Sequence, residues 1–337
     1  MNEKHLSYFK VENFKRFESF EMNNIGQFNL ILGDNNVGKT SVLEALLFDL
    51  ENANQFRDNL LTVLYEFRKI GENIENPLQL FITQESKHQE EFFITVSNVK
   101  KTICISTMYP FNDFDIPENF ISEDEVLIGL LGKYDAERAK ENTPYIPFHI
   151  GYDNDLITYF SKFIQFKRNT RKDIIEALKV IIPTIESLEI SMPELNSPIL
   201  LVAQSNKNEM MPLSMFGEGA IKLFRILAKI IVHKGKRLMI DEIDAGVHFK
   251  KFKDFWRTIL LATKQNEVQI FATTHNLECL QAFKEVLEET EMIDFQEDAR
   301  CFELLELPNK QVEAYTYTYS QFSGMLANGN NIRGGVI

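Results

Sequence analysis

The sequence predicts an α/β fold in which helices flank a mixed, mostly parallel β-sheet. Three observations support this prediction. Apolar, strand-like runs alternate with amphipathic, helix-like segments near both ends of the chain. A glycine-rich loop at residues 33–40 joins a strand to a helix, and an acidic cluster follows a second apolar run at residues 238–240. Strand–helix alternation of this kind is typical of parallel sheets.

The predicted elements are clearest outside the middle of the chain. We expect strands at 6–14, 17–22 and 28–32, then a helix over 39–50. The C-terminal part predicts a helix at 220–232, a strand ending at Asp241, a helix from about 248 to 263, a strand at 268–273, a helix at 277–289, and strands at 301–307 and 311–318. Between them, we expect strands at 78–82, 91–96, 101–107 and 199–203, helical segments at 60–70 and 158–182, and loops within 109–155.

Composition restricts the class of protein. The chain has 337 residues, too many for one small core, and 44% of them are apolar. Its net charge of −13 excludes a generic nucleic-acid coat. Five basic residues within 162–172 leave open either a local contact surface or a solvated helix face.

The chain also lacks the marks of secretion and of thiolate metal binding. The three cysteines, Cys104, Cys279 and Cys301, are scattered and predict neither a disulfide framework nor a zinc site. Cys279 is best read as a buried thiol. The N-terminus has no apolar signal segment and no window is long and apolar enough to cross a bilayer, so we expect a cytoplasmic protein.

Residues 33–40, GDNNVGKT, fit the pattern GxxxxGK[ST] in full. The glycines let backbone N–H groups point at phosphate oxygens, and the N-terminus of the following helix adds partial positive charge. Lys39 can reach the β- and γ-phosphates, and Thr40 can ligate Mg²⁺. We therefore expect the following residues to bind a nucleoside triphosphate: Gly33, Asn35, Asn36, Val37, Gly38, Lys39, Thr40 and Ser41.

The acidic cluster Asp241, Glu242 and Asp244 supplies complementary chemistry. In a protein with such a loop, an acid at the end of a neighbouring apolar strand holds Mg²⁺, and Asp241 fits that role. Glu242 is one residue further along and can act as general base on the attacking water. The alternative is that Asp241 and Glu242 only mark the end of a strand and the start of a turn. The presence of the phosphate loop disfavours this alternative.

Four further motifs, taken together with the phosphate loop, indicate a resemblance to a known family. They are PLSMFGEG at 212–219, LMIDE at 238–242, DAG at 244–246 and ATTH at 272–275. Together with the phosphate loop, they resemble the ATP-binding-cassette (ABC) ATPases, in particular the soluble SMC-like branch and stand-alone OLD-family ATPases of bacteria. The resemblance covers about residues 4–50 and 196–335. It implies an ABC-type ATPase head formed by 1–50 and 196–337, with an N-terminal antiparallel β subdomain and an inserted helical and β lobe at 51–195.

The resemblance also implies roles for individual residues. Ser214, Gly217, Glu218 and Gly219 would belong to a signature loop, residues 214–219, that contacts the γ-phosphate of ATP held by a second subunit. Asp244 and Gly246 would form a D-loop at the dimer interface, and His275 would be a switch histidine beside the γ-phosphate. Arg16, with Lys15, would lie near the nucleotide. The loop departs from the usual LSGGQ, so which of its residues contacts phosphate stays open.

The function implied is an ATPase switch. Its cofactors would be ATP and Mg²⁺, and a homodimer or higher homo-oligomer would form through sandwiched ATP. A separate effector, such as a Toprim-type nuclease in an anti-phage or DNA-transaction system, and contact with DNA are further expectations. A slow or non-hydrolysing ATP sensor remains an alternative. A transporter subunit is disfavoured by the long separation of Lys39 and Asp241, and a built-in nuclease by the short segment after His275.

Overall fold

The computed structural model describes residues 5–49, 52–70, 77–82, 91–96, 99–105, 125–128, 134–194 and 197–328. A six-stranded sheet forms the centre of the molecule, in the order β14-β13-β3-β12-β11-β7. Its strands are β3 (Phe28–Gly33), β7 (Tyr145–Ile146), β11 (Arg237–Ile240), β12 (Gln269–Thr273), β13 (Ala299–Glu306) and β14 (Val312–Thr318). All neighbouring pairs are parallel except β13 and β14. The predicted mixed, mostly parallel sheet is confirmed.

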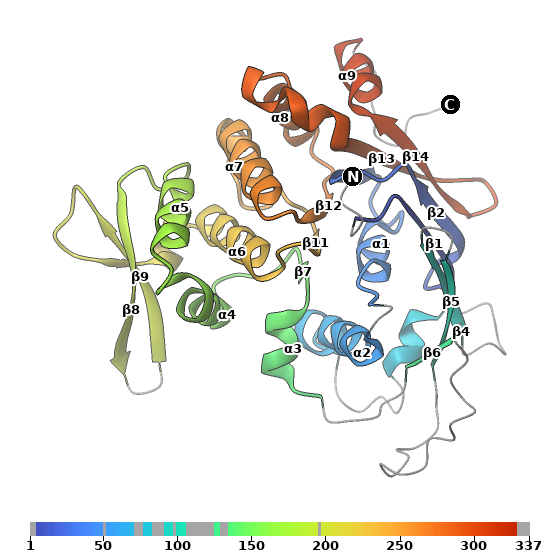
Figure 1. Cartoon of the computed structure of the whole chain (residues 1–337), viewed down its shortest axis with the longest axis horizontal. Helices are drawn as coiled ribbons and strands as arrows, with labels where there is room; N and C mark the ends of the chain where they lie inside the picture. Colours follow the sequence, from blue (N-terminus) through green and yellow to red (C-terminus); the bar gives the residue numbers. More distant parts are fainter. Residues whose placement is uncertain are drawn as a thin grey trace.

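Helices cover both faces of this sheet (Figure 1). They are α1 (Lys39–Ala45), α6 (Glu218–Val232), α7 (Phe252–Gln265) and α8 (Leu277–Leu287). Successive strand side chains point to opposite faces. Leu238 and Ile240 therefore join the core beneath α6, α7 and α8, whereas Met239 joins the core around α1. The apolar run 238–240 is thus buried on both sides, as expected of an interior parallel strand.

A second sheet packs over α1. It has the order β2-β1-β4-β5-β6 and comprises β1 (Tyr8–Phe14), β2 (Phe17–Asn23), β4 (Glu91–Val96), β5 (Val99–Ile105) and β6 (Glu125–Ile128). Phe9, Phe14 and Phe20 of its first two strands are buried in the core that also holds α1. The predicted N-terminal antiparallel strands are therefore present, and they shield the helix that follows the phosphate loop.

Helical segments and a hairpin occupy the middle of the chain and its C-terminal side. They are α2 (Ala53–Thr62), η1 (Val63–Phe67), η2 (Pro77–Phe81), α3 (Ala136–Asn142), α4 (Asp155–Tyr159), η4 (Phe160–Ile164), α5 (Arg168–Leu178), η5 (Leu213–Phe216), η6 (Phe249–Lys251), η7 (Thr290–Asp298) and α9 (Tyr319–Ala327). β8 (Ile185–Glu194), β9 (Ser197–Gln204) and β10 (Met211–Pro212) form a three-stranded antiparallel sheet. In the described residues, no helix is both long and apolar enough to span a membrane.

Residues 51–195, predicted as one inserted lobe, are distributed over several parts of the molecule. Strands β4 to β6 extend the sheet of β1 and β2, and β7 is an edge strand of the central sheet. Among the described residues of this range, α4, α5 and the β8–β9 hairpin lie on the α6 side of the molecule and share its core (Figure 1). The boundaries at residues 50 and 196 stay a prediction.

One element prediction is wrong. Residues 78–82 were expected to form a strand, but Pro77–Phe81 is a 3₁₀ helix. The buried side chains Leu78 and Phe81 are three residues apart, which matches a helical turn and not the alternation of a strand. Helix α1 ends at Ala45, earlier than the predicted 39–50, and β7, β8 and α9 were not foreseen.

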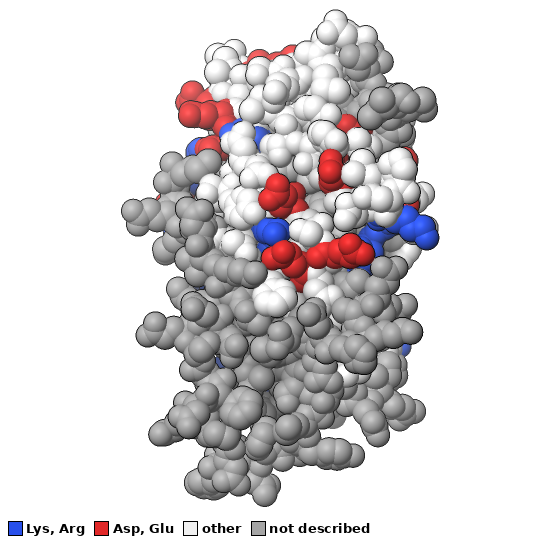
Figure 2. Space-filling model, turned by 90° about the vertical axis from the view of Figure 1, so that its right-hand side faces the viewer, with Lys and Arg blue, Asp and Glu red and all other residues white. Residues whose placement is uncertain are grey.

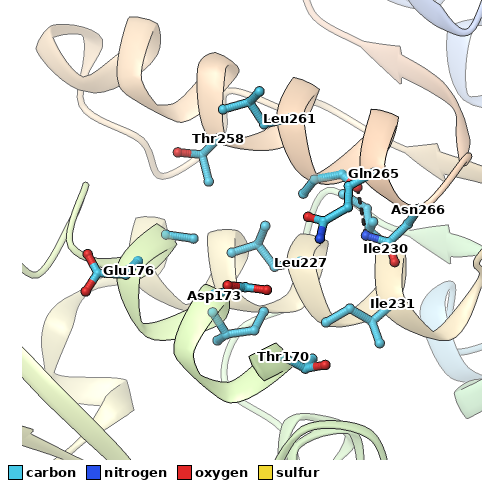
Figure 3. Close-up of a pocket in the computed structure, with 13 residues that line it drawn as sticks. Thr170, Asp173, Glu176, Leu227, Ile230, Ile231, Thr258, Leu261, Gln265 and Asn266 are labelled. Atoms are coloured by element: carbon cyan, nitrogen blue, oxygen red, sulfur yellow. Dashed lines mark hydrogen bonds between the residues drawn. The ribbon is translucent and has the colours of Figure 1, made fainter. Parts of the chain in front are cut away.

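Helix α6 is joined to the α4–α5 region by a buried ion pair. Arg225 donates from Nε and Nη2 to the two carboxylate oxygens of Asp155, both at 2.9 Å, and also to the carbonyl oxygens of Ile150 and Gly151. The side chains of Arg225 and Asp155 are 1% and 6% exposed. Apolar side chains of α4, α5 and α6 share one core at this junction, and a pocket of about 350 Å³ lies between α5, α6 and α7 (Figure 3). The ion pair adds a buried polar link to this apolar contact.

We predict that Asp155→Asn lowers the free energy of unfolding by about 3–5 kcal/mol, because it leaves the guanidinium buried without its counter-charge. Urea denaturation measures this change. Glu176→Ala removes an exposed pair with Lys179 on α5 and should cost less than about 1 kcal/mol. Equal effects of the two substitutions would contradict this assignment.

Candidate nucleotide-binding site

The phosphate loop connects β3, at the centre of the sheet, to α1. Gly33 and Gly38 have φ values of +145° and +110°, and Asn36 has +65°. A Cβ at Gly33 would lie 2.8 Å from the carbonyl oxygen of Leu304 on β13, and one at Gly38 would lie 2.9 Å from side-chain atoms of Phe17 and Arg16. Both positions therefore require glycine, because any side chain there would clash with the neighbouring atoms and would be strained at these φ values.

Lys39 is the first residue of α1 and its side chain turns back over the loop. The residue is only 8% exposed, and Nζ donates to the carbonyl oxygens of Gly33 and Asp34 at 2.8 Å each. Burial lowers the pKa of the Lys39 ammonium, and the nearby carboxylates of Glu242 and Asp241 partly oppose that shift. The ammonium thus lies at the mouth of a loop whose geometry suits phosphate oxygens.

Asp241 follows β11 and is held by hydroxyl groups from three other elements. Its Oδ2 accepts from Thr40 Oγ1 at 2.9 Å and from the Tyr145 hydroxyl at 3.4 Å, and its Oδ1 accepts from Thr273 Oγ1 at 2.6 Å. Asp241 as a whole residue is 7% exposed. Thr40 and Asp241 are therefore brought together from opposite halves of the chain, as the motifs predicted.

The pair Thr40 and Asp241 fits Mg²⁺ by its donor chemistry. Mg²⁺ prefers oxygen ligands and is commonly held by one or two protein oxygens together with substrate phosphates. No group of three or more His, Cys, Asp or Glu side chains that could hold a metal occurs within the described ranges. A hydroxyl and one carboxylate beside a phosphate loop are the protein ligands that such a site requires.

Glu242 has an unusual backbone. Its φ is +44°, in the left-handed region, which costs about 1–3 kcal/mol for a residue other than glycine. Its N–H donates to Thr273 Oγ1 at 2.8 Å, and Oε1 lies 3.3 Å from His275 Nδ1. The Glu242 carboxylate therefore faces the histidine. The structure thus brings together Asp241, Glu242 and His275, but the strain at Glu242 has no signal in the sequence.

The predicted signature loop and D-loop contact each other within the chain. Gly217 is the N-cap of α6, and Ser214 is exposed on the preceding 3₁₀ turn. A Cβ at Gly219 would lie 2.8 Å from the carbonyl oxygen of Gly246, and one at Gly246 would lie 2.7 Å from Glu218 Cβ. Gly246 itself has a φ of +77°. Glycine at 219 and 246 permits this close approach.

Asp244, predicted at the dimer interface, is 9% exposed and accepts from Thr274 Oγ1 at 2.6 Å. Its carboxylate therefore has a partner in its own subunit.

Arg16 and Lys15 lie at the loop in different ways. The Arg16 guanidinium donates to the carbonyl oxygen of Asn36 in the phosphate loop and pairs with Glu306. Lys15 instead pairs with Glu44, a fully buried carboxylate of α1. Arg16 thus lies at the phosphate loop, whereas the charge of Lys15 is engaged by Glu44; their place near a nucleotide stays a prediction.

Several contacts in this region were not predicted. Lys222 donates to backbone carbonyl oxygens at 241 and 242, Tyr145 reaches Asp241, and Thr273 bridges Asp241 and Glu242. Of these, only Thr273 lay within a motif that the sequence singled out. Cys279 is a buried free thiol, as predicted.

Comparisons with known proteins agree with this geometry. The family model described as "AAA domain, putative AbiEii toxin, Type IV TA system" matches residues 28–280. A Helicobacter pylori protein named "ATP/GTP phosphatase" is 22% identical over 96% of this chain and 99% of its own length.

Two solved structures share the fold. An SMC head bound to the C-winged helix domain of ScpA has a TM-score of 0.53 at 11% identity, covering 93% of this chain and 98% of its own. An SMC head domain with an extended coiled coil, bound to the C-terminal domain of ScpA derived from Pyrococcus furiosus, has a TM-score of 0.53 at 10% identity, covering 96% and 99%. These likenesses confirm the ABC-type head fold; the closer likeness to OLD-family ATPases stays a prediction. Because the family match spans most of the chain and includes both the phosphate loop and the acidic cluster, the protein belongs to the AAA domain family described as putative AbiEii toxin of type IV toxin–antitoxin systems.

Proposed function

We propose that the protein binds ATP with Mg²⁺ and hydrolyses it to ADP and phosphate. The observation that carries this proposal is the 2.9 Å contact between Thr40 and Asp241, beside the buried ammonium of Lys39. It unites the three groups that handle a triphosphate and its metal in phosphate-loop proteins. The "ATP/GTP phosphatase" name of the Helicobacter pylori relative supports the same activity.

Each group has a distinct task in this proposal. The N–H groups of the loop and the Lys39 ammonium bind the β- and γ-phosphates, and Thr40 and Asp241 would hold Mg²⁺, which neutralises phosphate charge when bound. Glu242 accepts a proton from the water whose oxygen attacks the γ-phosphorus, so that ADP leaves. His275, 3.3 Å from Glu242, orients that carboxylate.

We further propose that two copies pair around ATP. The signature loop suits this role because Met215 is 65% exposed and Ser214 is also exposed, just before the N-terminus of the 15-residue helix α6. Free N–H groups and the positive end of a helix bind anions such as the γ-phosphate of a neighbouring subunit. A cytoplasmic ATP switch of this kind would act on a separate effector, such as a Toprim-type nuclease in anti-phage defence.

Lys39→Ala should weaken ATP binding about 10- to 100-fold, because charge-assisted hydrogen bonds to phosphate are lost. Isothermal titration with ATP and Mg²⁺ measures the change. Lys253→Ala, which removes an exposed lysine on α7 that pairs with Glu285, serves as the control and should leave the affinity unchanged. An unchanged affinity of Lys39→Ala would refute the assignment of the loop.

Glu242→Gln should lower the hydrolysis rate about 100-fold or more while leaving ATP binding intact, because the amide cannot accept the proton of water. Phosphate release measures the rate. Light scattering after size exclusion should show twice the monomer mass when this variant is saturated with ATP. A mass that stays monomeric would exclude the sandwich. A wild-type rate as low as that of the variant would favour the alternative of an ATP sensor.

A second proposal is that DNA contacts the segment between η4 and α5. Phe166 is 86% exposed, and the exposed Lys167 and Arg168 follow it at the N-terminus of α5. Aromatic stacking on bases combined with cationic contact to phosphate is typical of single-strand binding. The opposite side of the molecule is unsuitable, since acidic side chains gather over the described part of that face, where Glu18, Glu21 and Glu313 are exposed on β2 and β14 (Figure 2).

The double variant Phe166→Ala, Arg168→Ala should weaken binding of fluorescein-labelled oligothymidylate about tenfold or more, because it removes one stacking platform and one phosphate contact. Fluorescence anisotropy over a series of salt concentrations measures the affinity. Lys179→Ala, at the far end of α5, is the control. Equal affinities of wild type and double variant would disprove this contact.

A further inference from the structure

Lys222 lies one turn inside α6 and its ammonium is buried at the base of the candidate site. The residue is 7% exposed, and Nζ donates to the backbone carbonyl oxygens of Glu242 and, at 3.4 Å, Asp241. No ion pair to Lys222 occurs among the described residues. A lysine is almost never buried unless its ammonium has polar partners, because burial removes the hydration of the charge. Here the ammonium donates to the backbone carbonyl oxygens of the two acidic residues, Asp241 and Glu242.

The backbone at Glu242 needs such support. With φ at +44°, this residue adopts a conformation that persists only where surrounding contacts enforce it. Thr273 fixes the N–H of Glu242, and the carbonyl oxygen of Thr273 accepts from the N–H of Ile243. Lys222 donates to the remaining backbone polar group, the Glu242 carbonyl oxygen, which also accepts from the N–H of Ala245 at 3.0 Å within the same turn. The direction of the Glu242 carboxylate is therefore set from two sides, by β12 and by α6.

The same helix carries the signature loop. Gly217 caps α6, and Lys222 follows Glu218 by four residues, which is about one helical turn. The helix start also contacts the backbone of Gly246, because a Cβ at Gly219 would lie 2.8 Å from its carbonyl oxygen. A shift of the first turn of α6 therefore moves the Lys222 ammonium relative to the carbonyl oxygen of Glu242.

We propose that Lys222 is a positioning residue that holds the strained backbone of Glu242 and ties its carboxylate to the helix that begins at the signature loop. The inference rests on the proposed function, since Glu242 is taken as the group that activates water. Lys222 touches neither substrate nor metal in this scheme. It acts through Glu242, so its loss affects the hydrolytic step and spares nucleotide binding.

The test compares Lys222→Met, which keeps an unbranched side chain as far as the ε position but removes the donor, with Lys222→Arg, which keeps the charge and the donors. We expect kcat for ATP hydrolysis to fall about 10- to 100-fold in the methionine variant, because small displacements of a catalytic group have effects of this size. The Kd for ATP, from isothermal titration, should stay within about twofold of wild type. The arginine variant should recover a substantial part of kcat.

Lys229→Met is the matched control. Lys229 lies on the same face of α6, is 2% exposed, and also donates to backbone carbonyl oxygens, but those belong to residues 140, 141 and 143. Its kcat should remain near that of wild type, at a temperature where circular dichroism shows every variant to be folded. A drop equal to that of Lys222→Met would mean that any buried lysine of α6 has this effect, and would overturn the proposal.

Other outcomes separate the inference from the proposed function. A wild-type protein that binds but does not hydrolyse ATP would refute the proposed hydrolysis itself, and this inference with it. An active wild type with an unchanged kcat in Lys222→Met refutes only the inference. Parallel losses of affinity and kcat, with no recovery in Lys222→Arg, show a general structural role and also overturn it. If the methionine variant does not fold, Lys222→Gln, whose donor lies about one bond closer to the backbone, takes its place. A reduced kcat at wild-type affinity then supports positioning, and a wild-type kcat refutes it.

Discussion

The parallel alignment of β3, β12 and β11 is the constraint on which the rest of the site depends. Neighbouring parallel strands end at the same edge of a sheet, so the segments that follow them meet there. The phosphate loop follows β3, and Asp241 follows β11. Thr273 is the last residue of β12, and Thr274 and His275 come directly after it. Three segments that are far apart in the sequence are thereby placed within hydrogen-bond distance of one another.

This arrangement concentrates negative charge that must be compensated. Three carboxylates lie within four residues, and Asp241 and Asp244 are nearly buried. Hydroxyl groups of Thr40, Thr273 and Thr274 donate to the two aspartates. Two buried ammonium groups, at Lys39 and Lys222, add positive charge nearby. Burial lowers the pKa of Lys222 to about 8, while the three carboxylates favour its charged form. A cationic ligand bound by Asp241 would complete this balance.

Sequence motifs predicted the centre of the site because their chemistry requires a fixed order. Lys39 and Thr40 need a strand before them and a helix after them, and Asp241 needs an apolar strand, so local patterns were sufficient. The fold class followed from the same alternation of elements. The strand predicted at 78–82 was wrong because four apolar residues in a short run fit both a strand and a helical turn.

Contacts made through the backbone could not be predicted in this way. The left-handed turn at Glu242 depends on Thr273 and Lys222, which lie on different elements, and no pattern around residue 242 marks it. Three cations of α6 are buried, which the sequence does not indicate, because each finds oxygen acceptors in other segments; they are Lys222, Arg225 and Lys229. Similarly, Asp244 was assigned by its motif, but Thr274 engages its carboxylate within the same chain.

The most direct test of the central claim is a crystal structure of the protein with Mg²⁺ and a non-hydrolysable ATP analogue. The account predicts the triphosphate inside the curl of residues 33–40, with Lys39 Nζ on its phosphate oxygens. It also predicts Mg²⁺ beside Thr40 and Asp241, with ligand distances of about 2.1 Å. An analogue bound elsewhere, with Lys39 still donating to Gly33 and Asp34 and no metal near Asp241, would contradict it.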